Sequence, residues 1–189
     1  MITKPFSPRD IFAQPVVNSS RVFLSPQRYI QGPGVIKNCG LYLSLINAKH
    51  VGVLASKRGF SAEAANVLQS LSEAGIEYSK AEFRGECSKE EVERHTNDLM
   101  SAKPDCILAV GGGKLVDAGK CIAYRLNCQV GIIPTLASND APCSSISVLY
   151  TVDGVKDVVE YFPQNPAFVI VDTEVIVNAS ERYLVAGIG

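Results

Sequence analysis

Three consecutive glycines at the junction of two regular segments constrain this chain more than any other feature. Gly111–Gly113 follow the apolar run Cys106–Val110 and lead into Val116–Ala123, which has the spacing of a helix. Glycine leaves the backbone N–H groups uncovered, so a phosphate can approach them, and the positive end of a helix favours an anion. Lys114 follows directly. The segment therefore predicts a strand, a turn that holds a nucleotide pyrophosphate, and a helix.

Two well-known phosphate motifs do not match this turn. A Walker A loop would need glycine in place of Leu108 and a hydroxyl residue in place of Leu115. The G-x-G-x-x-G fingerprint fails because its third glycine would fall on Val116. A glycine-rich connection that only packs a helix on a sheet remains an open alternative.

Apolar runs alternate with helical segments of ten to fifteen residues along most of the chain. Strands are expected at residues 51–55, 77–83, 106–110, 129–134 and 168–172, of which the first and the last are expected to be buried. This alternation predicts an α/β fold: an open, mostly parallel Rossmann-like sheet with helices on both faces. Two further runs, 145–150 and 155–161, flank Asp153-Gly154 and predict an antiparallel hairpin.

Local signals refine the expected elements. A short strand is expected at Arg21–Leu24, and a helix is expected from Val35 to Ile46. Ser61 is expected to cap a helix that ends at Gly75. Another helix is expected to begin with a capping box, in which Ser88 is the N-cap and Glu91 the third residue.

Composition excludes several classes of protein. The net charge of −1 and 47% hydrophobic residues give no basic stripe, so no nucleic-acid partner is expected. No apolar run approaches the ~18 residues of a membrane span, and no secretory signal is visible. The six cysteines form no C-x-x-C pair and indicate reduced packing thiols in a cytoplasmic protein. His50 and His95 are expected at the surface, so no metal cluster is predicted.

The chain divides into three parts. Residues 1–20 form a polar N-terminal arm, and residues 21–178 form a dinucleotide-binding α/β domain. Residues 179–189 start a helical second domain, whose apolar stripe has only begun with Leu184, Val185 and Ile188. We interpret the ending as a truncation, or as a domain boundary cut short.

A second loop, Pro134–Ser145, leaves the carboxyl end of a predicted strand, where open α/β sheets bind their ligands. The hydroxyl groups of Thr135, Ser138 and Ser144 can form hydrogen bonds with phosphate, ribose or amide groups. Asp140 is its only acidic residue. An ordinary polar loop is the alternative from composition alone.

Taken together, the two loops resemble glycerol dehydrogenases of the iron-containing alcohol dehydrogenase superfamily. The likeness rests on Gly111–Asp117, Pro134–Pro142 and Ser147–Tyr150, and it extends from about Val22 to Gly189. Its specific part is Asn139-Asp140-Ala141-Pro142. Relatives such as glycerol-1-phosphate dehydrogenase and dehydroquinate synthase share the glycine turn but differ after the Pro-Thr.

The resemblance implies a role for each matching position. Gly112, Gly113, Lys114 and Asp117 would surround the pyrophosphate and the adjoining ribose, and Asp140 would contact the substrate hydroxyls. The rest of the cofactor would be lined by Thr135, Ser138, Ser144, Ile146 and Tyr150.

The implied activity is the NAD(P)-dependent oxidation of glycerol, or a related vicinal diol, to dihydroxyacetone by reversible hydride transfer. The expected partners are a small polyol and further copies of the chain in a homo-oligomer. One alternative is a non-catalytic dinucleotide-binding fragment or split subunit. The other is an enzyme like glycerol-1-phosphate dehydrogenase, against which Asn139-Asp140-Ala141-Pro142 argues.

The chain departs from the family in two respects. Where relatives place an acid that favours NAD, it has Ser56 followed by Lys57 and Arg58, so NADP is possible. The family's metal, zinc in the glycerol branch, is held by an aspartate after Gly-Ile-Gly and by two histidines in an all-helical C-terminal domain. These ligands lie beyond Gly189, so no metal ligand is assigned here. The isolated chain is therefore expected to be inactive and prone to self-association.

Overall fold

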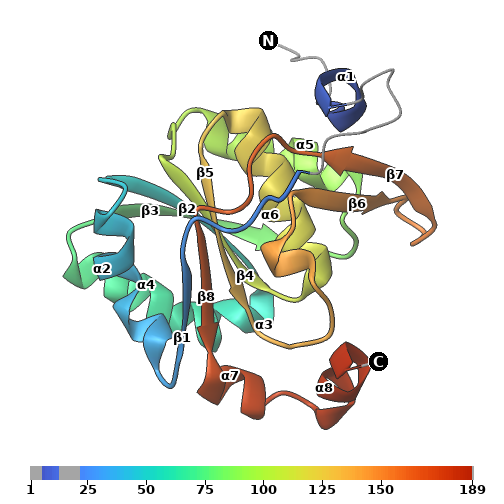
Figure 1. Ribbon diagram of the computed structural model, residues 1–189. Coiled ribbons are helices and arrows are strands. Elements are labelled where there is room, and N and C mark those ends of the chain that lie inside the picture. The colour runs from blue at the N-terminus through green and yellow to red at the C-terminus, as the bar shows by residue number, and fades with distance from the viewer. Residues whose placement is uncertain (1–5, 13–21, 189) are drawn as a thin grey trace.

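The computed structural model describes residues 6–12 and 22–188, and Figure 1 shows their arrangement. The elements run in the order α1 (Pro8–Phe12), β1 (Tyr29–Gly32), η1 (Val35–Asn38), α2 (Cys39–Ser44), β2 (His50–Ser56), α3 (Lys57–Phe60), α4 (Glu63–Glu73), β3 (Glu77–Phe83), α5 (Lys89–Met100), β4 (Cys106–Gly111), α6 (Gly113–Leu126), β5 (Gln129–Pro134), η2 (Ala141–Cys143), β6 (Ile146–Tyr150), β7 (Lys156–Tyr161), β8 (Phe168–Asp172), α7 (Thr173–Val177) and α8 (Glu181–Ile188).

The larger sheet has six strands in the order β1-β8-β5-β4-β2-β3, and every neighbouring pair is parallel. All carboxyl ends therefore lie at one edge. The five strands expected from apolar runs are present, and the predicted open parallel α/β sheet is confirmed.

Alternate strand residues face two separate hydrophobic clusters. Val53 and Leu108 point to the face covered by η1, α2 and α4, whereas Leu54 and Ile107 point to the face covered by α5 and α6. Because both faces are buried, the central strands read as continuous apolar runs in the sequence.

The hairpin of β6 and β7 forms a second, antiparallel sheet, as predicted. Gly154 in its turn has φ +82°, which an L side chain rarely adopts. Leu149 buries the hairpin against the α5–α6 face, and the rings of Tyr124 and Phe162 lie 5.3 Å apart there. The hairpin thus covers the side of α6 that faces away from the sheet.

The first predicted strand is wrong. Residues 22–24 form no strand, and Arg21 lies outside the described residues. Phe23 is 89% exposed, whereas Tyr29–Gly32 pairs with β8 as the edge strand β1. An apolar composition cannot show which segment finds a neighbouring strand. In the expected N-terminal arm, the described residues include the short helix α1.

The helix expected from Val35 to Ile46 is a 3-10 turn followed by the short helix α2. Leu41 and Leu45 are exposed. A Cβ on Gly40 would lie 2.4 Å from the carbonyl oxygen of Ser70, so α2 presents Gly40 to α4 and packs very closely there. This close approach turns the two leucines outward.

Helix capping agrees with the sequence in part. Ser88 accepts a hydrogen bond from the N–H of Glu91, and Gly75 follows α4 with φ +69°. Ser61 does not cap α4, whose N-cap is Ala62, so this prediction is wrong. Instead, Ser56 caps the unpredicted helix α3, and Ser61 follows the last turn of α3.

The six cysteines are free, and Cys39, Cys87, Cys106 and Cys121 are buried, as expected of packing thiols. Within the described residues, no helix has both the length and the apolar character needed to cross a membrane.

Substitution of Gly119 tests how closely α6 packs on β4. A Cβ at this position would lie 2.5 Å from the Cβ of Ala109. We expect Gly119→Ala to lower the free energy of unfolding by about 1–3 kcal/mol in a urea titration, because this overlap outweighs the gain in helix propensity. Adding Ala109→Gly should restore part of the loss, since it removes the opposing methyl group. A Gly119→Ala protein as stable as the parent would contradict this packing.

Candidate functional site

The topology places a switch point between the carboxyl ends of β2 and β4. From β2 the chain passes to β3 on one side, and it later returns to β4 on the other side. Such a switch point is where open α/β sheets bind their ligands. Ser56 ends β2 and Gly111 ends β4, and the two strands pair up to Ala55 and Val110.

The glycine turn connects β4 directly to the N-terminus of α6, a helix of 14 residues. The N–H groups of Leu115 and Val116 both donate to the carbonyl oxygen of Gly112, at 3.0 Å. The N–H groups of Gly113 and Lys114 precede this first intrahelical bond and have no acceptor within the helix. The turn therefore offers the backbone donors of an anion site.

The two loops singled out in the sequence lie against each other. The N–H of Thr135 donates to the carbonyl oxygen of Gly111 at 3.2 Å. A Cβ on Gly112 would lie 3.3 Å from Leu136, and one on Gly113 would lie 2.9 Å from the amide nitrogen of Asn139. The turn thus also serves the packing role that the sequence left open.

Lys114 lies at the turn, but its ammonium group is already paired. Its Nζ donates to Oε1 of Glu86, in the loop between β3 and α5. The Lys114 side chain is 57% exposed and that of Glu86 is 22% exposed. Glu86 could not be singled out from the sequence, because the contact joins residues 28 positions apart.

The loop after β5 holds its polar side chains in two ways. Asn139 bonds Ser138 Oγ at 3.1 Å and accepts from the N–H of Ala141 at 3.1 Å, which shapes the start of η2. Asp140 is exposed, and its carboxylate does not cap η2. Its carboxylate is therefore free to accept a hydrogen bond from a hydroxyl group of a small molecule that arrives from solvent.

The residues expected to line the rest of the cofactor follow η2. Ser144 Oγ is 3.3 Å from Nζ of Lys120, and Ile146 is 38% exposed. Tyr150 donates its N–H to the carbonyl oxygen of Cys87 at 2.8 Å. Lys120 was missed in the sequence: it is 3% exposed, and an (i, i+3) acid is the only local signal for its burial.

Asp117 is 8% exposed, and its described contacts are internal. Its Oδ2 accepts from the N–H of Val148 at 3.0 Å, and its Oδ1 lies 2.9 Å from Nζ of Lys120. Its expected contact with a ribose stays a prediction.

Ser56 ends β2 at the switch point and caps α3, since its Oγ accepts from the N–H of Gly59 at 3.0 Å. Lys57 and Arg58 are exposed, and Arg58 lies 3.5 Å from Glu63 in an ion pair. The two cations therefore stand at the same edge of the sheet as the glycine turn.

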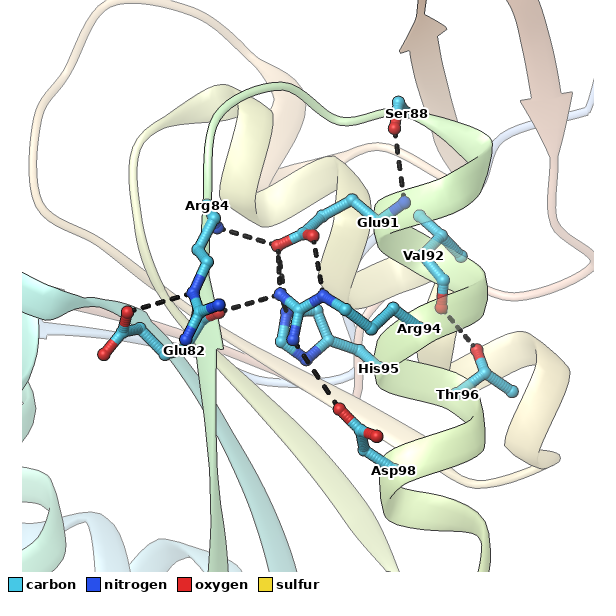
Figure 2. A network of polar contacts seen from close by, with 9 residues as sticks. All are labelled: Glu82, Arg84, Ser88, Glu91, Val92, Arg94, His95, Thr96 and Asp98. Carbon is cyan, nitrogen blue, oxygen red and sulfur yellow. Dashed lines mark hydrogen bonds and ion pairs between the residues drawn. The ribbon is translucent and has the colours of Figure 1, made fainter. Parts of the chain in front are cut away.

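His95 is buried, not at the surface as predicted, and it belongs to the polar network shown in Figure 2. Its Nε2 lies 3.1 Å from Glu91 Oε1 and 3.0 Å from Nη2 of Arg94. The charged residue next to His95 in the sequence does not indicate that His95 is exposed, because adjacent residues of a helix point to different faces.

The network fixes the start of the loop that carries Glu86. Oε1 of Glu91 accepts from the N–H of Arg84 at 2.7 Å, and Arg94 donates to the carbonyl oxygen of Glu82 at 3.0 Å. Burial raises the pKa of Glu91, but hydrogen bonds from Arg94 and Arg84 outweigh it and hold that pKa below its usual value. Burial and the adjacent Arg94 charge lower the pKa of His95.

No group of three or more His, Cys, Asp and Glu side chains in residues 6–12 and 22–188 is arranged to hold a metal ion.

Residues 26–173 match the family described as iron-containing alcohol dehydrogenase. The chain belongs to this family. It is 40% identical over 169 residues to a glycerol dehydrogenase of Escherichia coli, with 89% of this chain and 46% of that protein covered. A glycerol-1-phosphate dehydrogenase of Pyrobaculum aerophilum is more distant, at 30% identity with 88% and 45% covered.

The crystal structure of glycerol dehydrogenase from Schizosaccharomyces pombe has the same fold, with a TM-score of 0.83 at 37% identity, over 90% of this chain and 43% of that chain. The chain spans about half the length of the curated relatives that it matches. The family resemblance inferred from the two loops is confirmed.

Acid should destabilise this chain partly through His95. Below its unfolded pKa of about 6.5, the unfolded chain takes up a proton that the buried native side chain resists. The free energy of unfolding should therefore fall as the pH drops from about 6.5 toward the lowered native pKa, by up to about 1.4 kcal/mol per pH unit. His95→Gln should flatten this part of the profile in urea titrations at a series of pH values.

His50→Gln is the matched control for the loss of one histidine, since His50 lies at the opposite end of the sheet beside Ser79. A His95→Gln profile as steep as that of the parent would contradict the buried neutral state of His95.

Proposed function

We propose that this chain binds a nicotinamide dinucleotide across the carboxyl ends of β2 and β4. The observation that carries the proposal is the glycine turn at the N-terminus of α6, at the switch point of the sheet. Two N–H groups without intrahelical acceptors, a helix dipole and Lys114 together suit the pyrophosphate. The donor set therefore fits the cofactor.

The proposed roles of the other cofactor-lining residues follow from their positions along the carboxyl edge of the larger sheet. Thr135 and Ser138 lie beside the glycine turn and are proposed to bond the cofactor's phosphate or ribose groups. Ser144, Ile146 and Tyr150 continue the lining along η2 and β6, toward the nicotinamide and adenine sides.

We propose that the protein of which this chain forms part oxidises glycerol, or a related vicinal diol, to dihydroxyacetone or the matching ketone. The 40% identity to glycerol dehydrogenases supports this substrate class. The bound cofactor supplies the hydride acceptor, and Asp140 accepts a hydrogen bond from a substrate hydroxyl. The described residues supply no metal ligand set, so no step is assigned to zinc.

A homo-oligomer in the cytoplasm is the proposed assembly and location. Apolar side chains exposed on α7 and α8 support self-association, among them Val177 at 81% and Ile188 at 80%. The six free cysteines support a reducing compartment.

Fluorescence titration with NADH tests the proposed site. The chain should bind NADH saturably, and Lys114→Met should weaken binding about tenfold because a cation beside the pyrophosphate is lost. Glu86→Gln should tighten binding severalfold, since it releases Lys114 from its ion pair. No binding by the parent would contradict the proposal.

Lys89→Met is the matched control. Lys89 is also 57% exposed and pairs with an acid, Asp157, but it lies at the hairpin. Its loss should leave NADH affinity unchanged.

The Ser56-Lys57-Arg58 turn predicts relaxed or reversed cofactor preference. A hydroxyl beside two exposed cations accommodates a 2′-phosphate. NADPH should therefore bind about as tightly as NADH, and Lys57→Ala/Arg58→Ala should weaken NADPH about tenfold while sparing NADH. Lys37→Ala, an exposed lysine in η1, serves as control. Much tighter binding of NADH than NADPH by the parent would overturn this assignment.

A further inference from the structure

Lys120 is a buried cation that joins α6 to the loop beyond it. Its Nζ lies 2.9 Å from Asp117 Oδ1, 3.0 Å from the carbonyl oxygen of Ala141 and 3.3 Å from Ser144 Oγ. It also donates to the carbonyl oxygen of Ile146. An ammonium group has three N–H donors, and the hydrogen bonds to Ala141, Ser144 and Ile146 use all three, so the contact with Asp117 is an ion pair.

Asp117 extends the same attachment to β6. Its Oδ2 accepts from the N–H of Val148 at 3.0 Å, and its carbonyl oxygen accepts from Ser147 Oγ at 3.0 Å. Ser147 is fully buried. The acid and the lysine, one helical turn apart, therefore hold residues 141–148 against α6 at both ends.

Stability alone is a weak explanation for this pair. Taking two charges out of water carries a desolvation penalty that an apolar pair would avoid. What the charges add is direction, because their hydrogen bonds to Ala141, Ile146 and Val148 each hold one backbone group of the loop in place. Ser144 and Ile146 lie within the held segment, and Asp140 precedes it directly.

We propose that Asp117 and Lys120 are positioning residues for the cofactor and substrate site. They hold residues 141–148 so that Ser144 and Ile146 line the cofactor and Asp140 faces the diol. Asp117 then acts through this loop, in place of a direct contact with ribose. This inference rests on the proposed function.

Cys143 provides a reporter inside the held segment. It is half-buried, and so is Cys128, which follows α6 outside the segment. Burial and Asp140 raise the pKa of Cys143, whereas the charge of Lys120 lowers it. Removing Lys120 would slow alkylation of Cys143 through charge alone, so faster alkylation reports that the loop has opened.

The test uses Asp117→Asn/Lys120→Met, which removes both charges so that neither is left buried alone. Iodoacetamide labelling should become at least about tenfold faster at Cys143 relative to Cys128, the scale of losing bonds to a charged donor. The dissociation constant for NADH should rise about tenfold. Ser147→Ala removes one bond of the same set and should shift both readouts less, and it serves if the double variant does not fold.

Arg125→Met is the matched control. Arg125 also joins α6 to the hairpin, through Glu160 at 2.7 Å, but its side-chain hydrogen bonds go to Glu160 and Cys121 and not to residues 141–148. It should lower stability without moving either readout.

An unchanged Cys143 to Cys128 labelling ratio would overturn the inference. An opened loop with unchanged NADH affinity would also overturn it, because the pair would then be merely structural. Failure of the parent chain to bind NADH overturns the proposed function, whereas the labelling ratio still decides whether the pair holds the loop.

Discussion

The close packing of α6 on β4 is the contact on which the rest of the described structure depends. Gly119 brings the helix against Ala109, so the axis of α6 lies closer to the sheet than a larger residue would permit. That placement puts the N-terminus of α6 at the switch point. It also brings Asp117 and Lys120 under the loop that follows β5.

The two ion pairs near the carboxyl edge of the sheet differ in their exposure to solvent. The pair of Lys114 and Glu86 is partly exposed, so an anion at the glycine turn competes with Glu86 for the ammonium group. The pair of Asp117 and Lys120 is buried and keeps its geometry. The network around His95 fixes the start of the loop that carries Glu86 (Figure 2). The exposed pair can therefore rearrange on binding while the buried one holds the frame.

The sequence predicts the fold well where local pattern and burial coincide. Continuous apolar runs identify the central strands because both faces of a parallel sheet are covered. Prediction fails where a polar residue is buried by distant partners: Lys120 by a segment some 20 residues on, and His95 by its orientation on α5. The glycine turn and Asp140 are visible in the sequence, whereas the buried contacts that place them are not.

The departure from G-x-G-x-x-G has a physical reason in this structure. In that fingerprint the third glycine allows close packing of the helix on the strand. Val116 stands at that place and is buried, and Gly119, almost one turn later, makes the close approach instead. Val116 then adds to the core, while Gly111 and Gly112 keep the turn tight against Leu115 and Leu136. The ten residues from Gly111 to Lys120 thus encode the glycine turn, the packing of its helix and the attachment of the neighbouring loop.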